Sequence, residues 1–283
     1  MMQMVSSIDN DFSGDEYQAL QLALQDTLGV VVGEEGRDLI TGKLQPLMAR
    51  ERLSRLSELA NALRQESPGG IRSDVLDAIT THHTRWFGYP EINRLLNNYI
   101  LPSLIEKQLA ECRFWLVGCG QGQSAYSLAM LLDDLRQQLG SEIRITLVAT
   151  DTSDALVEKA ASGIYDNVEL EGLPQSRHRR YLTAVDDSRQ QWQVNDSLRD
   201  MLQFRRLDLL QEAADMGRFD VIIAPDVLMY FSVPLRSRLL CDFAALLDPA
   251  GILVVNHNEP VIPFCERFDM VDHEAGRFYR QVK

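Results

Sequence analysis

Residues 112–130 read Cys112-Arg-Phe-Trp-Leu-Val-Gly-Cys-Gly-Gln-Gly-Gln-Ser-Ala-Tyr-Ser-Leu-Ala-Met130. The apolar run at 114–117 predicts a buried strand, and residues 126–135 predict a helix. Between them Gly118, Gly120 and Gly122 predict a tight turn. Glycines let the backbone approach a ligand closely, and free N–H groups at the start of a helix favour polar or anionic ligand groups. The stretch therefore predicts a binding site at a strand–turn–helix junction.

A second strand narrows the choice of ligand. The pattern Gly-x-Gly-x-Gly is shared by nicotinamide, flavin and S-adenosylmethionine enzymes, and also by turns that bind nothing. In residues 142–151 polar and apolar side chains first alternate and then give way to an apolar run. This pattern predicts a strand that ends on Asp151, where a ribose would lie. Asp151 lies 33 residues after Gly118, later than the roughly 20 residues of a dinucleotide fingerprint. The spacing therefore argues against NAD.

Composition excludes several classes of protein. The 283 residues are 45% hydrophobic and 24% charged, which is typical of a soluble globular chain with one substantial core and a small appendage. The net charge of −13 disfavours binding to nucleic acid or to an anionic membrane surface, because both need an excess of Lys and Arg. The N-terminal residues do not resemble a signal peptide, and no window approaches about 18 apolar residues. We therefore expect a cytoplasmic protein without membrane insertion.

The cysteines argue against a metal centre. Cys112, Cys119, Cys241 and Cys265 show no Cys-x-x-Cys pattern and no His partner at metal-ligand spacing. This favours a reduced protein with neither disulfides nor a metal site. Cys119 lies inside the glycine turn, where it serves either as a nucleophile or as a small packing residue, and packing is the more common role.

The N-terminal part is expected to be an all-helical domain, residues 1–81. Ser13 and Glu16 predict a capped helix that stops at Gly29, followed by helices at 34–48, interrupted by Pro46, and at 50–65. Within the last of these, Arg50, Arg52 and Arg55 stand out against an acidic background, and we expect Arg52 and Arg55 to share a helix face. They form either a solvated helix face or a docking surface for an acidic partner.

The remainder, residues 82–283, alternates strands and helices. Strands are expected near 201–207, 219–224, 251–255 and 276–282, with helices at 153–163 and 234–247. This order predicts a mainly parallel sheet whose carboxyl-end edge holds the ligand. Residues 164–204 break the rhythm, so we expect a small inserted antiparallel β-subdomain there. The predicted fold class is α/β, a mainly parallel sheet with a helical N-terminal domain.

A family resemblance is carried by short segments in order from residue 79 to the C-terminus. They are Thr80-Thr-His-His-Thr-Arg-Trp-Phe87, residues 118–130, Ala149-Thr-Asp151, Ala161-Ser-Gly-Ile-Tyr165, Arg180-Tyr-Leu182, Asp208-Leu-Leu210, Phe219-Asp-Val-Ile-Ile, Asp226-Val-Leu-Met-Tyr-Phe231, Leu247-Asp-Pro-Ala-Gly-Ile-Leu253 and His257-Asn-Glu259. With these the chain resembles the CheR-type chemoreceptor glutamate methyltransferases, which use S-adenosylmethionine to esterify receptor glutamates. The N-terminal part also resembles that family, with Gly29-Val-Val-Val followed by Arg37-Asp38.

The resemblance implies a Rossmann-like class I methyltransferase sheet, S-adenosylmethionine as cofactor and S-adenosylhomocysteine as product. It implies that Tyr230 lies near the transferred methyl group as the catalytic-site residue. The implied partner is the cytoplasmic domain of a chemoreceptor or a similar acidic helical protein, met by Arg50, Arg52 and Arg55. The residues implied to bind the cofactor are His82, Thr84, Gly118, Gly120, Gly122, Ser124, Asp151, Asp208, Leu209, Asp226 and Val227.

The chain departs from the family pattern at several positions. A cofactor-contacting glutamate of the family corresponds to Ser124, and an arginine that helps to hold the cofactor corresponds to Gly88. Arg-Asn of the family is replaced by Pro225-Asp226, and Asn-Leu by Asp208-Leu209. Losing a glutamate and an arginine together indicates a remodelled pocket, with Arg85 as a candidate substitute.

Three functions remain open. The first is an active protein-glutamate methyltransferase. The second is a degenerate relative that binds a signalling partner without transferring a methyl group. The third is a methyltransferase of the same fold with a different acceptor. The loop at 185–191 has no glycine, unlike the longer glycine-rich loop of family members that dock a receptor tail, so we expect a plain surface hairpin.

Overall fold

The computed structural model describes residues 12–65, 70–80, 84–107, 109–138, 140, 142–188, 190–209, 213–262 and 264–282. His82, one of the expected cofactor residues, lies outside them. Contacts between residues divide the chain into two compact units, 1–80 and 81–283. We refer to them as the helical unit and the sheet unit.

The helical unit consists of α1 (Gly14–Leu28), a short 3₁₀ turn η1 (Glu34–Gly36), α2 (Arg37–Arg50), α3 (Leu56–Arg64) and α4 (Ile71–Thr80). The helices α1 and α3 pack together, and so do α2 and α4. Ser13 caps α1 by accepting a hydrogen bond from the Glu16 N–H (3.3 Å), and Gly29 ends it with a φ of 64°. This stop was predicted, because a left-handed residue after a helix favours glycine.

The predicted start of the helix at 50–65 is wrong, and so is the predicted interruption at Pro46. Helix α2 continues through Pro46 to Arg50, and α3 begins only at Leu56. The Glu58 carboxylate accepts hydrogen bonds from the N–H groups of Ser54 (2.7 Å) and Arg55 (3.2 Å), which satisfies the start of a separate helix. Arg52 lies in the intervening turn with a φ of 58°. Arg52 and Arg55 therefore do not share a helix face.

The sheet unit is built on a seven-stranded sheet in the order β6-β2-β1-β7-β8-β10-β9. Strands β6, β2, β1, β7 and β8 are parallel, and β10 runs antiparallel to both β8 and β9. The bounds are β1 (Glu111–Val117), β2 (Arg144–Asp151), β6 (Leu202–Arg206), β7 (Phe219–Ile223), β8 (Leu247–Val254), β9 (Phe268–His273) and β10 (Gly276–Gln281). The predicted α/β class and the mainly parallel sheet are confirmed.

Successive side chains of each strand point to opposite faces of the sheet, and other elements cover both faces. Phe114 and Leu116 belong to a core that also includes residues of α5 (Pro90–Leu95), the π-helical turn η2 (Leu96–Ile100), α6 (Leu101–Glu106) and α7 (Gln123–Gln138). Trp115 faces the other way and packs against Phe219 of β7 and against Phe243 of α11 (Val233–Leu246). The ring centroids are 5.4 Å apart in each case. Trp115 is therefore a core residue.

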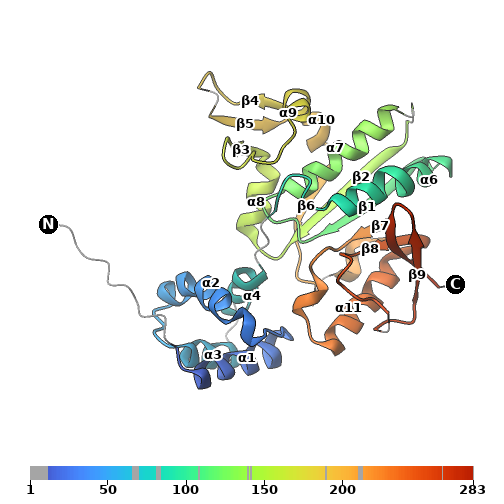
Figure 1. Ribbon diagram of the computed structural model, residues 1–283. Coiled ribbons are helices and arrows are strands. Elements are labelled where there is room, and N and C mark those ends of the chain that lie inside the picture. The colour runs from blue at the N-terminus through green and yellow to red at the C-terminus, as the bar shows by residue number, and fades with distance from the viewer. Residues whose placement is uncertain are drawn as a thin grey trace. The chain divides into compact units, whose positions relative to one another are not determined.

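A second, three-stranded antiparallel sheet is inserted between α8 (Asp154–Ser162) and β6. Its order is β3-β5-β4, with β3 (Ile164–Asp166), β4 (Leu182–Ala184) and β5 (Gln191–Val194). Figure 1 shows it as a separate small sheet with α9 (Gln175–Tyr181) and α10 (Asp196–Arg199) beside it. The predicted inserted antiparallel element is confirmed. The described helices include none long and apolar enough to cross a bilayer.

Candidate functional site

The glycine turn is closed by backbone contacts to the end of β2. The N–H groups of Gly118 and Cys119 both donate to the Thr150 carbonyl at 2.9 Å, and the Gly120 N–H donates to Asp151 Oδ2 at 2.7 Å. Tyr126 N–H donates to the Gly122 carbonyl (2.9 Å), and the N–H groups of residues 123–125 precede this bond at the start of α7. Such leading N–H groups have no partner within the helix. The turn therefore presents backbone donors beside a carboxylate.

Two of the glycines are required by contacts within the protein. Gly120 has a φ of 51°, and a Cβ there would lie 2.5 Å from Cγ2 of Thr84. Gly122 has a φ of 97°, and a Cβ there would lie 2.7 Å from the hydroxyl of Tyr165. Both conformations disfavour other residues, and both positions are packed by a side chain. Any side chain at Gly120 or Gly122 would displace Thr84 or Tyr165.

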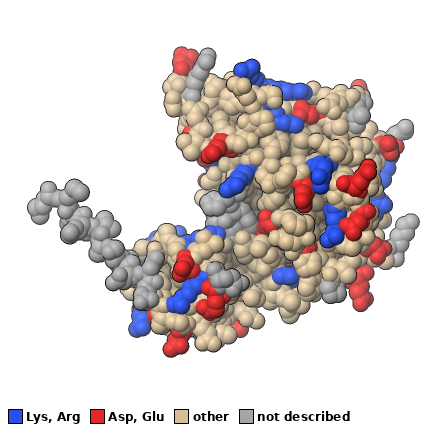
Figure 2. Space-filling view, in the orientation of Figure 1, with Lys and Arg blue, Asp and Glu red and all other residues tan. Residues whose placement is uncertain are grey.

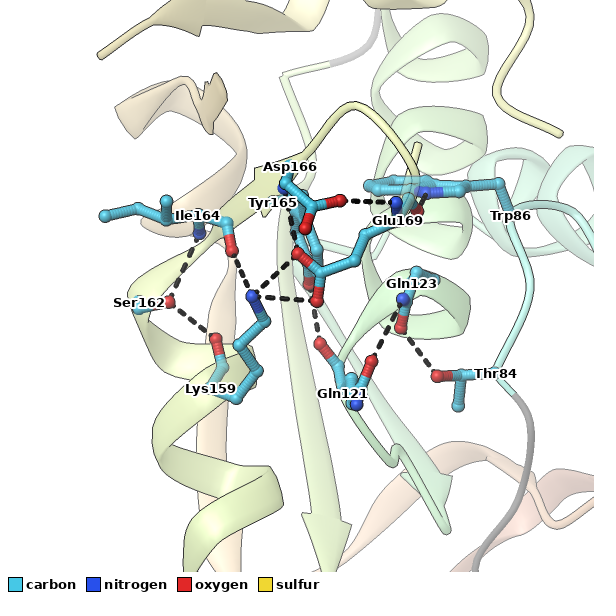
Figure 3. A network of polar contacts seen from close by, with 10 residues as sticks. All are labelled: Thr84, Trp86, Gln121, Gln123, Lys159, Ser162, Ile164, Tyr165, Asp166 and Glu169. Atoms are coloured by element: carbon cyan, nitrogen blue, oxygen red, sulfur yellow. Dashed lines mark hydrogen bonds and ion pairs between the residues drawn. The ribbon is translucent and has the colours of Figure 1, made fainter. Parts of the chain in front are cut away.

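A short segment before α5 is held against the turn (Figure 3). The Thr84 hydroxyl donates to Oε1 of Gln123 at 2.6 Å. The Phe87 N–H donates to the Ser127 hydroxyl at 2.9 Å. Gln123 is only 4% exposed, so its amide is a buried polar group that needs such a partner. Sequence reasoning did not single out Gln123, because a glutamine at a helix start is ordinarily a surface residue.

The remaining acidic positions lie where the parallel strands end. The Leu207 N–H donates to the Asp151 carbonyl at 2.8 Å, so Asp208 and Leu209 follow β6 next to the end of β2. Asp226 and Val227 follow β7, which is the neighbour of β1 on its other side. Ligands of open α/β sheets bind at the edge where the strand order reverses, and here that point is between β1 and β7.

A buried carboxylate organises the backbone after β7 and β8. Glu259, 2% exposed, accepts the N–H groups of Asp226 (2.6 Å), Leu228 (2.7 Å), Met229 (3.2 Å) and Asn256 (3.2 Å). Asp226 has a φ of 58°, an uncommon conformation for a residue other than glycine. The Asn256 amide donates to Asp226 Oδ1 at 2.7 Å. Glu259 thus holds the strained turn that leads to η4 (Leu228–Tyr230).

Titratable groups around this turn are shifted toward their neutral forms. Burial raises the pKa of Glu259, although the N–H groups that it accepts oppose the shift. Burial and the carboxylate of Asp226 raise the pKa of Tyr89, and the same two causes raise the pKa of Tyr230. Both phenols therefore stay protonated and can donate hydrogen bonds at neutral pH.

Cys119 is a packing residue. It is fully buried, and burial together with the nearby Asp151 carboxylate raises the pKa of its thiol well above the usual range. Because the thiolate is the nucleophilic form of cysteine, this side chain is unsuited to nucleophilic catalysis.

The hydrogen-bonding groups at this edge suit an adenosyl group. Asp151 is partly exposed, and its contacts, from Gly120 and from the Ser153 N–H at 3.3 Å, use one lone pair on each oxygen. Each carboxylate oxygen can accept two hydrogen bonds, so both can also accept from the vicinal hydroxyls of a ribose. No charged side chain occupies position 88 or 124 for the amino-acid end of such a ligand. Arg85, within the segment at 84–88, is exposed and carries the only charge of that segment.

The strand order and the closed glycine turn give a Rossmann-like sheet with a candidate ligand site at the carboxyl ends of its parallel strands. The family described as "CheR methyltransferase, SAM binding domain" matches residues 82–276. The chain belongs to this CheR family, and its cofactor is S-adenosylmethionine.

Relatives along most of the chain are chemotaxis methyltransferases. The chain is 29% identical over 269 residues to "Chemotaxis protein methyltransferase Cher2" of Pseudomonas putida and 31% identical over 269 residues to "Chemotaxis protein methyltransferase 1" of Pseudomonas aeruginosa. Each match covers 94% of this chain and 97% of the relative. This chain is also 30% identical over 270 residues to "Chemotaxis protein methyltransferase" of Vibrio parahaemolyticus. That match covers 95% of this chain and 97% of the relative.

The three arginines that the resemblance implies meet the partner, Arg50, Arg52 and Arg55, differ in how they are paired. Arg50 forms ion pairs with Glu51 (3.0 Å) and Asp74, and Arg55 forms one with Glu16 (2.8 Å). Arg52 is exposed and has no ion pair within the described part of the chain. Figure 2 shows acidic and basic side chains interspersed on the face that it draws. Because Arg50 and Arg55 are paired with acids, the three arginines do not form an all-basic surface.

Proposed function

We propose that this protein transfers the methyl group of S-adenosylmethionine to glutamate side chains of a chemoreceptor or a related signalling protein in the cytoplasm. The observation that carries the proposal is the glycine turn closed on Asp151 within a CheR domain that spans residues 82–276. In the proposed site Thr84, the turn at 118–124, Asp151 and the residues after β6 and β7 surround the cofactor, with Tyr230 near the reacting end.

The chemistry needs positioning more than a base. When bound, the cofactor supplies an electrophilic methyl group on a sulfonium. A glutamate acceptor is already an anion at neutral pH, so the protein has to align it and exclude water. The protonated phenol of Tyr230 can orient an acceptor carboxylate by donating to it. The inert thiol of Cys119 supports direct transfer without a covalent enzyme intermediate.

The proposed acceptor is an acidic helical segment, and the proposed docking surface comprises Arg50, Arg52 and Arg55. Attraction between such a surface and an acidic partner steers association and sets orientation. Since Arg50 and Arg55 are already paired, Arg52 is the residue of the three that a partner can engage without breaking an ion pair.

The test has two stages. Calorimetric titration with S-adenosylmethionine and S-adenosylhomocysteine should give micromolar dissociation constants. Transfer of a labelled methyl group to a purified chemoreceptor cytoplasmic domain should then occur and should be lost when the acceptor glutamates are changed to alanine. Binding of the cofactor without transfer to any receptor glutamate would refute the proposed acceptor and favour the same fold acting on another one.

A second candidate function is supported by the residues at positions 88 and 124. Gly88 and Ser124 offer no charge to the amino-acid end of the cofactor. A protein that binds neither compound at millimolar concentration would be a signalling module that engages its partner without methyl transfer.

A further inference from the structure

The inserted sheet contacts the cofactor turn through one buried side chain. Tyr165 lies on β3 and is fully buried, and its hydroxyl donates to the Gln121 carbonyl at 2.7 Å (Figure 3). The same hydroxyl would lie 2.7 Å from a Cβ at Gly122. The peptide that joins Gln121 to Gly122 is therefore both hydrogen-bonded to Tyr165 and packed closely against it. Burial raises the pKa of this phenol well above its usual range, so it stays protonated and can donate at neutral pH.

Neighbouring groups fix β3 in place. Lys159 Nζ donates to the Ile164 carbonyl at 2.8 Å and pairs with the Glu169 carboxylate at 2.9 Å (Figure 3). Glu169 also accepts the Asp166 N–H at 2.8 Å, and Asp166 Oδ1 accepts the Glu169 N–H at 2.8 Å. The ammonium of Lys159 lies 5.3 Å from the centre of the Tyr165 ring. Tyr165 consequently has little freedom to move its hydroxyl away from the turn.

The segment at 84–88, which contacts the turn through Gln123, is also attached to the residues that follow Tyr165. The Trp86 indole N–H donates to the Glu169 carbonyl at 2.8 Å, and its ring meets that of Tyr165 edge-on with centroids 5.2 Å apart. Trp86 is two residues from Thr84, which holds Gln123 at the start of α7. The segment from Tyr165 to Glu169 thus supports the turn from both the Gln121 side and the Gln123 side.

We propose that Tyr165 is a positioning residue for S-adenosylmethionine binding, and that the inserted sheet acts through it as part of the cofactor site. The hydroxyl fixes the Gln121 peptide, and this holds the turn in the conformation in which the Gly120 N–H bonds Asp151 and the leading N–H groups of α7 remain available to the cofactor. The proposal rests on S-adenosylmethionine as the cofactor and is independent of which acceptor is methylated.

Tyr126 provides a matched control. It is also fully buried, and its hydroxyl also donates to a backbone carbonyl, that of Ala160 at 3.0 Å, outside the turn. The full-length variants Tyr165→Phe and Tyr126→Phe each delete one buried hydroxyl and leave one carbonyl without its donor, so they should lose similar stability in urea. A loss of buried hydrogen bonding alone would affect both variants alike.

The decisive measurements are calorimetric dissociation constants for S-adenosylhomocysteine and amide hydrogen exchange of residues 120–123 in the ligand-free protein. Tyr165→Phe should raise the dissociation constant about 5- to 20-fold and speed exchange in the turn, whereas Tyr126→Phe should change the dissociation constant less than about twofold. Unchanged affinity in Tyr165→Phe, or equal losses in both variants, would overturn the proposal. A wild-type titration without heat would instead overturn the cofactor assignment on which the proposal depends.

Discussion

Asp151 and Glu259 perform similar tasks on the two sides of the point where the strand order reverses, yet they differ in what they can still bind. Asp151 accepts two backbone N–H groups and remains partly exposed, whereas Glu259 accepts four and is buried. The first carboxylate has spare lone pairs for a ligand, and the second is fully used in holding the backbone. An acid at the end of a strand is therefore a binding residue only if the local N–H groups leave it free.

Glu259→Gln should have the largest effect, on stability. An amide in place of the carboxylate directs an NH₂ group at backbone donors, because each oxygen of Glu259 accepts two N–H groups. Leaving buried donors without acceptors should lower the free energy of unfolding by about 2–4 kcal/mol, measured by urea unfolding.

Glu58→Gln is the control for this substitution. Glu58 also accepts two backbone N–H groups, but it is exposed on the helical unit, so water can replace the lost bonds and the cost should stay below about 1 kcal/mol. Equal losses in the two variants would contradict the distinction between a buried scaffold carboxylate and an exposed one.

Asp151→Asn should affect ligand affinity more than stability. The amide oxygen can still accept the Gly120 N–H, so the free energy of unfolding should change by less than about 1 kcal/mol. Affinity for S-adenosylhomocysteine should fall about 10- to 100-fold, because a hydrogen bond to a charged group contributes about 1.5–3 kcal/mol. Calorimetry and urea unfolding on the same sample separate the two effects. A large loss of stability with unchanged affinity would place Asp151 with Glu259 as a scaffold residue.

Restoring the two charges that the family carries at positions 88 and 124 should raise affinity for the cofactor. In the double variant Gly88→Arg with Ser124→Glu, each new charge finds a partner at the amino-acid end of the cofactor, so affinity should rise about 3- to 10-fold. Either single change should do less. Gly88→Arg is sterically tight, since its Cβ would lie 3.2 Å from the Cβ of Arg85. Ser124→Gln, which adds size without charge, is the control, and an equal gain in it would refute the electrostatic explanation.

Much of the fold was predictable because its signals are local. The apolar runs at 114–117 and 219–224, the acid that ends β2 and the glycine that ends α1 each reflect a preference within a few residues. Helix 90–106 was missed because it contains Pro90 and Pro102, which usually interrupt a helical pattern. Here Pro90 occupies the first turn, and Pro102 follows the π-helical turn. Strand β9 was missed because it is an edge strand in which Phe268 alone is fully buried.

The contacts within the site were less predictable, because they join residues far apart in sequence. Gln123 meets Thr84, and Tyr165 meets Gln121, only once the chain has folded. The four donors that meet Glu259 come from two separate loops, so no local pattern marks it as buried. The strand pattern at 142–151 indicated Asp151, and the family resemblance indicated Asp226, while the structure supplied their different surroundings.

The distinction between used and available charges extends to the helical unit, where the smallest effect is expected. Arg50 and Arg55 are engaged by acids, as Glu259 is by N–H groups, while Arg52 resembles Asp151 in being available. Arg52→Ala should therefore raise the KM for a receptor substrate about 2- to 5-fold at low salt with kcat unchanged, since exposed charges contribute little each. The difference should vanish at high salt, where exposed charges are screened. Arg50→Ala is the control, because its guanidinium would have to leave Asp74 before it could meet a partner. If Arg50→Ala raised the KM more than Arg52→Ala, the pairing of these arginines would not determine which of them meets the receptor.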